Sequence, residues 1–195
     1  MPHPQPFVTE RLAIRPLRSD DLDDYALIFS DPEVMRYIGD GTPRSPERSR
    51  AAFEWSESLF TEHSIGIFAV TSCETGELIG DVLLVPILHS SANSTPSDYA
   101  ARGPHIELGY RLASRAWKKG YATEAARAVL DYAVAGPPAL SHLVGVTNQE
   151  NIASQRVLTK LGFLDHGTTD MYYNMSTRYF LYDASNSKTP EDDRA

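Results

Sequence analysis

A short basic segment stands out in an otherwise acidic chain. The run Gly109 to Gly120 (GYRLASRAWKKG) contains no acidic residue, although the 195-residue chain has a formal net charge of −8. Its basic residues are Arg111, Arg115, Lys118 and Lys119. A helix is expected to begin directly after Gly120, and a helix N-terminus offers unpaired N–H groups and the positive end of the helix dipole. The segment therefore predicts a turn that binds phosphate.

The same segment has a plainer interpretation, because loops that precede helices are often basic by chance. The chain contains neither a Gly-x-x-x-x-Gly-Lys-Ser/Thr loop nor a Gly-x-Gly-x-x-Gly fingerprint. A nucleotide-dependent phosphotransferase therefore loses its main support.

Three further polar residues outside this segment could take part in chemistry. Glu107 lies on a predicted strand just before it, and a carboxylate there could act as a general base or simply pair with a nearby arginine. Asn151 and Ser154 have the spacing of a helix N-cap and the residue one turn later, which is ordinary helix-start chemistry. Cys73 is the single cysteine, and the histidines show no metal-ligand spacing, so we expect no metal site.

These residues need a framework of strands and helices to position them. Hydrophobic patterning predicts the order strand, helix, strand, helix over residues 105–112, 120–135, 141–147 and 151–161. Such a β-α-β crossover is right-handed and places a parallel strand pair at the centre of a sheet.

The rest of the chain supplies the flanking elements. Residues 9–16 alternate as a strand, a helix follows from Ser19 to about Phe29, and Asp31-Pro32 is expected to end it. Further predictions are a helix at 46–62, an antiparallel hairpin from 65–71 and 77–85, and strands at 163–167 and 175–183. Residues 87–104 form either a substrate-side flap or an insertion without a role. Together they predict a mixed α/β sheet with helices on its faces.

Composition narrows the class of protein. Hydrophobic residues make up 42 % of the chain, and 26 acidic residues outnumber 18 basic ones. This balance disfavours nucleic acid as a partner, since a phosphate backbone needs clustered Lys and Arg. No apolar run approaches the ~20 residues that a membrane span needs, so we expect no membrane partner. A lone cysteine and the lack of a signal peptide favour a cytoplasmic location.

Several ordered motifs resemble those of the GCN5-related N-acetyltransferases, the GNAT superfamily. They are IELGYRL at 106–112, RAWKKGYATEA at 115–125, NQENIAS at 148–154 and LGF at 161–163. Within the superfamily the chain is most similar to the Rim-type branch, which acetylates N-termini of ribosomal proteins. The resemblance covers about residues 8–183. It implies a GNAT-like fold, with a mostly antiparallel mixed sheet, a central splayed parallel pair and helices on both faces, in one domain over 1–183 and a disordered polar tail at 184–195.

The resemblance also implies a cosubstrate and its contacts. Acetyl-CoA would bind the pyrophosphate loop Gln/Arg-x-x-Gly-x-Gly/Ala, in which Arg115 and Gly120 match the ends and Lys118 replaces the middle glycine. A left-handed backbone at Lys118 would cost about 1 kcal/mol. Glu107 is implied as the base, acting through water, and Ser154 as the acid that protonates the thiolate. The cofactor-binding residues are Leu112 (through its N–H), Arg115, Lys118, Lys119, Gly120, Tyr121, Ala122 and Asn151.

We therefore predict an enzyme that transfers the acetyl group of acetyl-CoA to a primary amine by direct attack in a ternary complex. The acceptor is either a protein N-terminus or a small-molecule amine. The alternative is a CoA-binding sensor or interaction module that has lost catalysis, for which Lys118 is the sequence hint. The acceptor and the oligomeric state stay open, with a homodimer among the options.

Overall fold

One mixed sheet organises the molecule. The computed structural model describes residues 4–87, 105–172 and 175–186. Within these residues eight strands form a sheet in the order β1-β2-β3-β4-β5-β6-β8-β7. Neighbouring strands run antiparallel except for β5 and β6, which are parallel. The strands are β1 (Phe7–Val8), β2 (Leu12–Pro16), β3 (Gly66–Ser72), β4 (Leu78–Ile87), β5 (His105–Leu112), β6 (His142–Asn148), β7 (Leu164–Thr169) and β8 (Thr177–Asp183).

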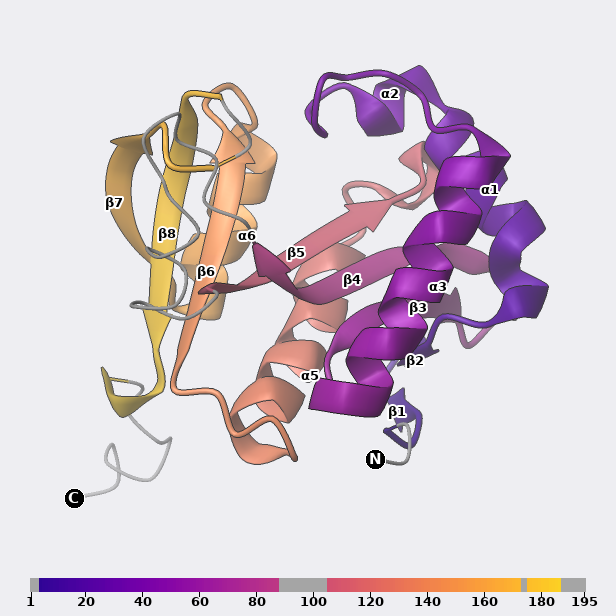
Figure 1. Cartoon of the computed structure of the whole chain (residues 1–195), viewed down its shortest axis with the longest axis horizontal. Coiled ribbons are helices and arrows are strands. Elements are labelled where there is room, and N and C mark those ends of the chain that lie inside the picture. The colour runs from indigo at the N-terminus through magenta and orange to yellow at the C-terminus, as the bar shows by residue number, and fades with distance from the viewer. Residues whose placement is uncertain (1–3, 88–104, 173–174, 187–195) are drawn as a thin grey trace.

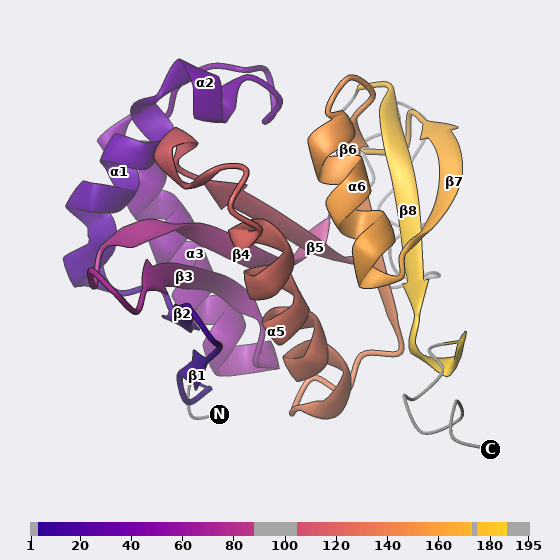
Figure 2. The ribbon, with the colours of Figure 1, turned by 180° about the vertical axis from the view of Figure 1, so that it is seen from behind.

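Helices cover both faces of the sheet. On one face lie α1 (Leu22–Ser30), α2 (Pro32–Met35) and α3 (Pro46–His63). On the other lie α5 (Tyr121–Ala135) and α6 (Ile152–Leu161), which are in front in the reverse view (Figures 1 and 2). Three 3₁₀ turns are η1 (Ser19–Asp21), η2 (Ser114–Ala116) and η3 (Ala184–Asn186). This arrangement confirms the predicted mixed α/β fold, including the parallel central pair.

Local chemistry explains where the helices begin and end. Ser45 accepts a hydrogen bond from the Arg48 N–H, and Pro46 occupies the first turn, so α3 begins as a capped helix. The side chain of Asn151 accepts from the Ser154 N–H and starts α6. That helix ends at Gly162, whose positive φ of 94° suits glycine.

Several boundaries differ from the sequence predictions. Residues 9–11 form a turn instead of the start of a strand, and the short β1 precedes them. The Asp31-Pro32 pair does end α1, but it also begins α2, because the Asp31 side chain caps the Glu33 N–H and proline fits a first helical turn. At the other end, residues 184–186 form a 3₁₀ turn, so ordered structure extends beyond Asp183.

Part of the predicted flap belongs to the sheet. Ile87 is the last residue of β4 and pairs with His105 of β5. The remaining residues of that prediction, 88–104, lie outside the described residues, as does the tail at 187–195.

The two central strands meet and then part. Strands β4 and β5 pair continuously from Gly80↔Leu112 to Ile87↔His105, whereas β5 and β6 register at one point, Glu107↔Val144. Beyond that point β5 turns away from β6, and the sheet opens into two halves (Figures 1 and 2).

The direction of the β5 backbone groups follows from this pairing. The Ala113 N–H bonds to the Ile79 oxygen, and Pro86 has no N–H to donate to Ile106. Because antiparallel strands exchange hydrogen bonds at alternate residues, the odd-numbered residues of β5 bond to β4. The Leu108 N–H therefore serves the single bridge to Val144, and the N–H and C=O groups of Tyr110 and Leu112 point into the gap beside β6.

A buried polar cluster fixes α1 to β4 and β5. The guanidinium of Arg111 forms an ion pair with Asp81, with Nε 2.9 Å from Oδ1, and Asp81 is fully buried. The Tyr25 hydroxyl donates to Asp81 at 2.8 Å and accepts from Arg111 at 2.8 Å. Burial raises the pKa of Tyr25, so the phenol keeps its proton for this bond. The cluster satisfies the charge of Arg111 inside the core.

Removal of one member of this cluster is expected to be costly. Asp81→Ala leaves the Arg111 charge buried without its carboxylate, so the free energy of unfolding should fall by about 3–5 kcal/mol. Urea denaturation measures the change. The matched control is Asp165→Ala, which breaks the exposed pair with Arg178 and should lower stability far less. Equal losses in the two variants would contradict the role of the buried cluster.

Candidate active site

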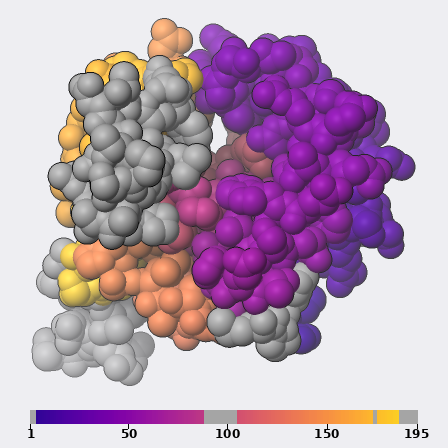
Figure 3. Space-filling model, in the orientation of Figure 1, coloured from indigo at the N-terminus to yellow at the C-terminus, as the bar shows by residue number. Residues whose placement is uncertain are grey.

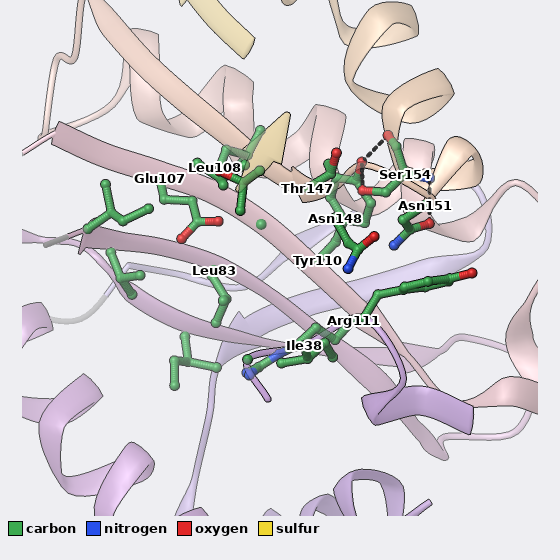
Figure 4. A pocket seen from close by; sticks show the side chains of 18 of the residues that line it. Ile38, Leu83, Glu107, Leu108, Tyr110, Arg111, Thr147, Asn148, Asn151 and Ser154 are labelled. Atoms are coloured by element: carbon green, nitrogen blue, oxygen red, sulfur yellow. Dashed lines mark hydrogen bonds between the residues drawn. The ribbon is translucent and has the colours of Figure 1, made fainter. Parts of the chain in front are cut away.

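A cavity lies where β5 and β6 part. Its volume is about 490 Å³, and residues from β4, β5, β6, α3, α6 and the segment 37–44 line it. In the space-filling view a hollow opens beside the N-terminal part of the chain (Figure 3). Figure 4 shows the side chains that surround the cavity.

Glu107 contributes the carboxylate of the cavity. Its exposed fraction is 5 %, and it stands on β5 opposite Val85 of β4. Side chains alternate along a strand, so Glu107, Gly109 and Arg111 lie on one face of β5, the face that α1 covers through the Arg111–Tyr25 contact. Leu83 and Leu108 are apolar neighbours on the cavity wall (Figure 4). The structure thus places the predicted base on the cavity wall.

On the opposite face of β5, Tyr110 meets Ser154. The Tyr110 hydroxyl donates to the backbone oxygen of Ser154 at 2.7 Å and lies 3.0 Å from the Ser154 hydroxyl (Figure 4). Burial raises the pKa of Tyr110, so this hydroxyl is protonated at neutral pH. Because the phenol proton goes to the carbonyl, the Ser154 hydroxyl is the donor of the 3.0 Å contact and the phenol oxygen is its acceptor. Tyr110 was not among the predicted site residues, since its partner is 44 positions away.

Two more polar side chains line the cavity beside Ser154. The Asn151 oxygen is used to cap α6, at 3.1 Å from the Ser154 nitrogen, so its NH₂ group stays available to the cavity. The Thr147 hydroxyl is buried and has no hydrogen-bond partner in the described part of the chain. A buried hydroxyl without a partner is costly, and a polar ligand in the cavity would satisfy it.

The predicted phosphate turn forms the start of α5. Gly120 is the N-cap with φ 82°, and no side chain caps the helix. The N–H groups of Tyr121 and Ala122 lie in the first turn, where a helix offers them no internal acceptor. Lys118 has φ 61°, so the position that replaces the family's middle glycine does adopt the left-handed conformation.

An arginine from the N-terminal segment supports this turn. Arg11 donates to the Lys119 oxygen at 2.9 Å and pairs with Glu124 in the first turn of α5 at 2.5 Å. Thr9 donates to the same carboxylate at 2.6 Å. Burial acts to raise the pKa of Glu124, but the hydrogen bonds from Thr9 and Arg11 outweigh it and hold that pKa below its usual value. Sequence reasoning missed this support because more than a hundred residues separate the partners.

Two predicted contact residues have structural partners of their own. The Arg115 guanidinium donates to the Leu78 oxygen at 2.9 Å, which fastens the turn to the start of β4. The indole of Trp117 donates to the Leu112 oxygen at 2.7 Å. The Leu112 N–H points into the β5–β6 gap, whereas Lys118 and Lys119 are exposed beside the helix N-terminus.

Most of the predicted residues therefore lie at two places, the cavity beside β5 and the start of α5. Glu107, Asn151 and Ser154 line the cavity, and Lys118 to Ala122 form the helix start that follows β5. In the described part of the chain, no group of three or more His, Cys, Asp or Glu side chains could hold a metal ion. None of the described helices is long and apolar enough to cross a membrane.

Comparison with known proteins identifies the family. Residues 11–164 match the family model of the acetyltransferase (GNAT) domain. The chain belongs to this GNAT family. Its members are acetyltransferases, so the predicted class of enzyme is confirmed, as is the resemblance to the superfamily.

Relatives and solved structures extend the comparison. The chain is 27 % identical over 172 residues to the uncharacterized N-acetyltransferase YoaA of Bacillus subtilis (strain 168), covering 88 % of this chain and 90 % of YoaA. A ribosomal-protein-S5-alanine acetyltransferase from Vibrio fischeri has a TM-score of 0.71 at 18 % identity, with 95 % of this chain and 100 % of that one covered. RimL, a ribosomal L7/L12 α-N-protein acetyltransferase solved with coenzyme A, has a TM-score of 0.71 at 15 % identity, with coverages of 92 % and 98 %. At these identities the two structures show that the GNAT fold is shared.

The residues present suit the coenzyme of a GNAT enzyme. The uncapped start of α5, with two lysines beside it, offers N–H donors and positive charge to a diphosphate. The β5 edge, the Asn151 amide and the unpartnered Thr147 hydroxyl offer hydrogen bonds to a chain of amides such as pantetheine. The donor set therefore fits the diphosphate and the pantetheine arm of acetyl-CoA.

The helix start gives a direct test of the coenzyme turn. A Cβ at Gly120 would lie 3.4 Å from Arg11 Nη2 on a backbone with φ 82°, so Gly120→Val should distort the N–H donors. We expect the affinity for acetyl-CoA in titration calorimetry to fall by roughly tenfold or more.

The matched control is Gly76→Val in the β3–β4 turn. Gly76 has φ 73° with nothing within 4 Å of an added Cβ, so this variant bears the same backbone strain away from the turn. It should bind acetyl-CoA as the wild type does. Unchanged affinity in the Gly120 variant would rule out this turn as the diphosphate site.

Proposed function

We propose that the chain transfers the acetyl group of acetyl-CoA to a primary amine by direct attack, with both substrates bound at once. One observation carries the proposal. At the β5–β6 opening, a buried carboxylate lies on one face of β5 and a hydroxyl pair on the other, with the free edge of the same strand between them. A proton acceptor, an oxyanion donor and a proton donor are thus available along one ligand path.

The coenzyme is proposed to lie along the β5 edge. The N–H groups of Gly120, Tyr121 and Ala122 would bind the diphosphate, and the exposed Lys118 and Lys119 would add positive charge. Asn151 would bind the pantetheine arm with the NH₂ group that capping leaves available. Arg115 would act indirectly, by holding the turn to β4.

Glu107 is proposed to accept the proton of the acceptor amine through water, because the proposed oxyanion donor Leu112 is five residues away on β5. An α-amino group has a reference pKa of about 7.7–8.0 and a lysine side chain about 10.4, so the amine is largely protonated at neutral pH and cannot attack. The buried carboxylate at 107 removes the proton and frees the nitrogen lone pair to attack the thioester carbonyl carbon.

Groups on the open edge of β5 and on α6 are proposed to stabilise the oxyanion and the thiolate that form next. The backbone N–H of Leu112, on the open edge, would donate to the carbonyl oxygen as it becomes an oxyanion. When the C–S bond breaks, the Ser154 hydroxyl would donate its proton to the leaving thiolate. Tyr110, 3.0 Å away and protonated, would then turn its proton from the Ser154 carbonyl to the Ser154 hydroxyl oxygen.

The acceptor is proposed to be either a protein N-terminus or a small-molecule amine. The two structural neighbours whose names identify ribosomal proteins as substrates favour the first option. The cavity of about 490 Å³ is large enough for the end of a peptide or for a whole small amine.

Ligand-dependent stability tests the proposed cosubstrate. Acetyl-CoA should raise the Tm, because a ligand at one hundred times its Kd stabilises the folded state by about 2.7 kcal/mol, whereas ATP should not. A free-thiol release assay across peptides, polyamines and amino acids then identifies acceptors. Stabilisation by ATP alone would contradict the proposal, and acetyl-CoA binding without thiol release for any acceptor would indicate a coenzyme sensor.

The pH dependence tests the proposed base. Glu107→Gln should lower kcat/KM by roughly 10²–10⁴-fold below the pKa of the acceptor amine, with recovery as rising pH deprotonates the amine in solution. Glu150→Gln, which alters an exposed carboxylate before α6, serves as the control and should keep the wild-type profile. A Glu107 variant with an unchanged pH–rate profile would remove this residue from the mechanism.

A further inference from the structure

The cavity has two halves, one on each face of β5. The Tyr110–Ser154 pair lies on the side of α6 (Figure 4). On the other side Val85 pairs with Glu107, and paired residues of neighbouring strands point to the same face. Leu83, two residues before Val85 on β4, points to that face as well. We call this part of the cavity, which α3 covers, the α3 half.

Apolar side chains make up most of the α3 half. Ile38 and Leu83 are seen on its wall in Figure 4, and Val85 also lines it. Two larger apolar residues line the same cavity and stay partly open to solvent. They are Trp55 of α3, which is 44 % exposed, and Met175, just before β8, which is 36 % exposed. A ligand with an apolar body would remove this surface from water, which is favourable.

The charged side chains of the cavity leave no anion for a second cation. Glu107 is the single carboxylate among the described residues that line it. Asp81 neutralises Arg111, and the same carboxylate attracts Arg44, which also interacts with the Tyr25 hydroxyl. Glu107 itself is engaged as the proposed proton acceptor. A second ammonium group in the ligand would therefore lose its water without gaining a counter-charge from the described lining.

We propose that the acceptor is a primary amine with an apolar body, and that Trp55 selects it. This inference rests on the proposed function, which places the coenzyme donors Asn151 and Ser154 on the other half and so leaves the α3 half to the acceptor. The amine nitrogen lies toward the open edge of β5, and the apolar body lies against Leu83 and Trp55. Polyamines are disfavoured. Two sources fit, an alkylamine and a peptide N-terminus whose first side chain is apolar.

Matched acceptor pairs test the selection and distinguish its two sources. The small-molecule pair is pentylamine and 1,4-diaminobutane, which have the same length and differ in a terminal methyl or ammonium group. The peptide pair is Leu-Ala-Ala-amide and Asn-Ala-Ala-amide, whose first side chains have nearly the same shape. For at least one pair, the wild type should prefer the apolar member by roughly ten- to hundredfold in kcat/KM. The pair that shows the preference identifies the source of the amine.

Variants assign the preference to the indole. Trp55→Ala should lower kcat/KM for the apolar member by roughly tenfold, through a higher KM, and change the polar member little. Trp55→Glu places a carboxylate at the same position, so it should raise kcat/KM for 1,4-diaminobutane and bring the ratio within that pair close to one. Leu164→Ala, on the edge strand β7, truncates another exposed apolar residue and should keep the full ratio. Circular dichroism checks that each variant is folded.

Binding measurements separate this inference from the proposed function. Calorimetry with the same pairs, on protein saturated with free coenzyme A, should show the same apolar preference in the wild type and a smaller one in Trp55→Ala. If that preference appears without any acetyl transfer, the proposed function fails and the apolar acceptor site stands. If acetyl transfer occurs without an apolar preference in either pair, or if Trp55→Ala weakens both members equally, the selection by Trp55 is overturned and the proposed function stands.

Discussion

The incomplete pairing of β5 with β6 is the constraint on which the site depends. The two strands meet at Glu107↔Val144 and then part, so the N–H and C=O groups on one edge of β5 lack a neighbouring strand. Backbone groups of this kind need partners, and a ligand with amide groups can supply them. Side chains alternate along β5, so Glu107 lies on one face of the strand and the Tyr110–Ser154 pair on the other, with this opening between them.

A strand that is free on one edge must be held firmly on its other sides. Continuous pairing with β4 holds β5 along its length. Near the C-terminal end of β5, the Asp81–Arg111–Tyr25 cluster links the strand to α1 by hydrogen bonds. The cluster also provides a neutral background, since Asp81 cancels the charge of Arg111.

Sequence patterns predicted most of the fold and only part of the site. Hydrophobic periodicity and caps such as Ser45 and Asn151 are local signals, so the helices and strands of the described residues appeared near their predicted places. The short α2 was missed because an Asp-Pro pair can end one helix and begin the next. Glu107, Asn151 and Ser154 were predicted and do line the cavity. Tyr110 and Arg11 were not, because their partners lie far along the chain.

The contact of Arg11 with Lys119 and Glu124 bears on how the molecule assembles. The two sides of this contact are more than one hundred positions apart, so closing the loop between them is entropically costly and occurs only once the intervening sheet has formed. During synthesis the first strands leave the ribosome well before α5 exists. The turn at Lys118 to Ala122, which we propose as the diphosphate site, is therefore expected to be completed late in folding, after other strands and helices have formed.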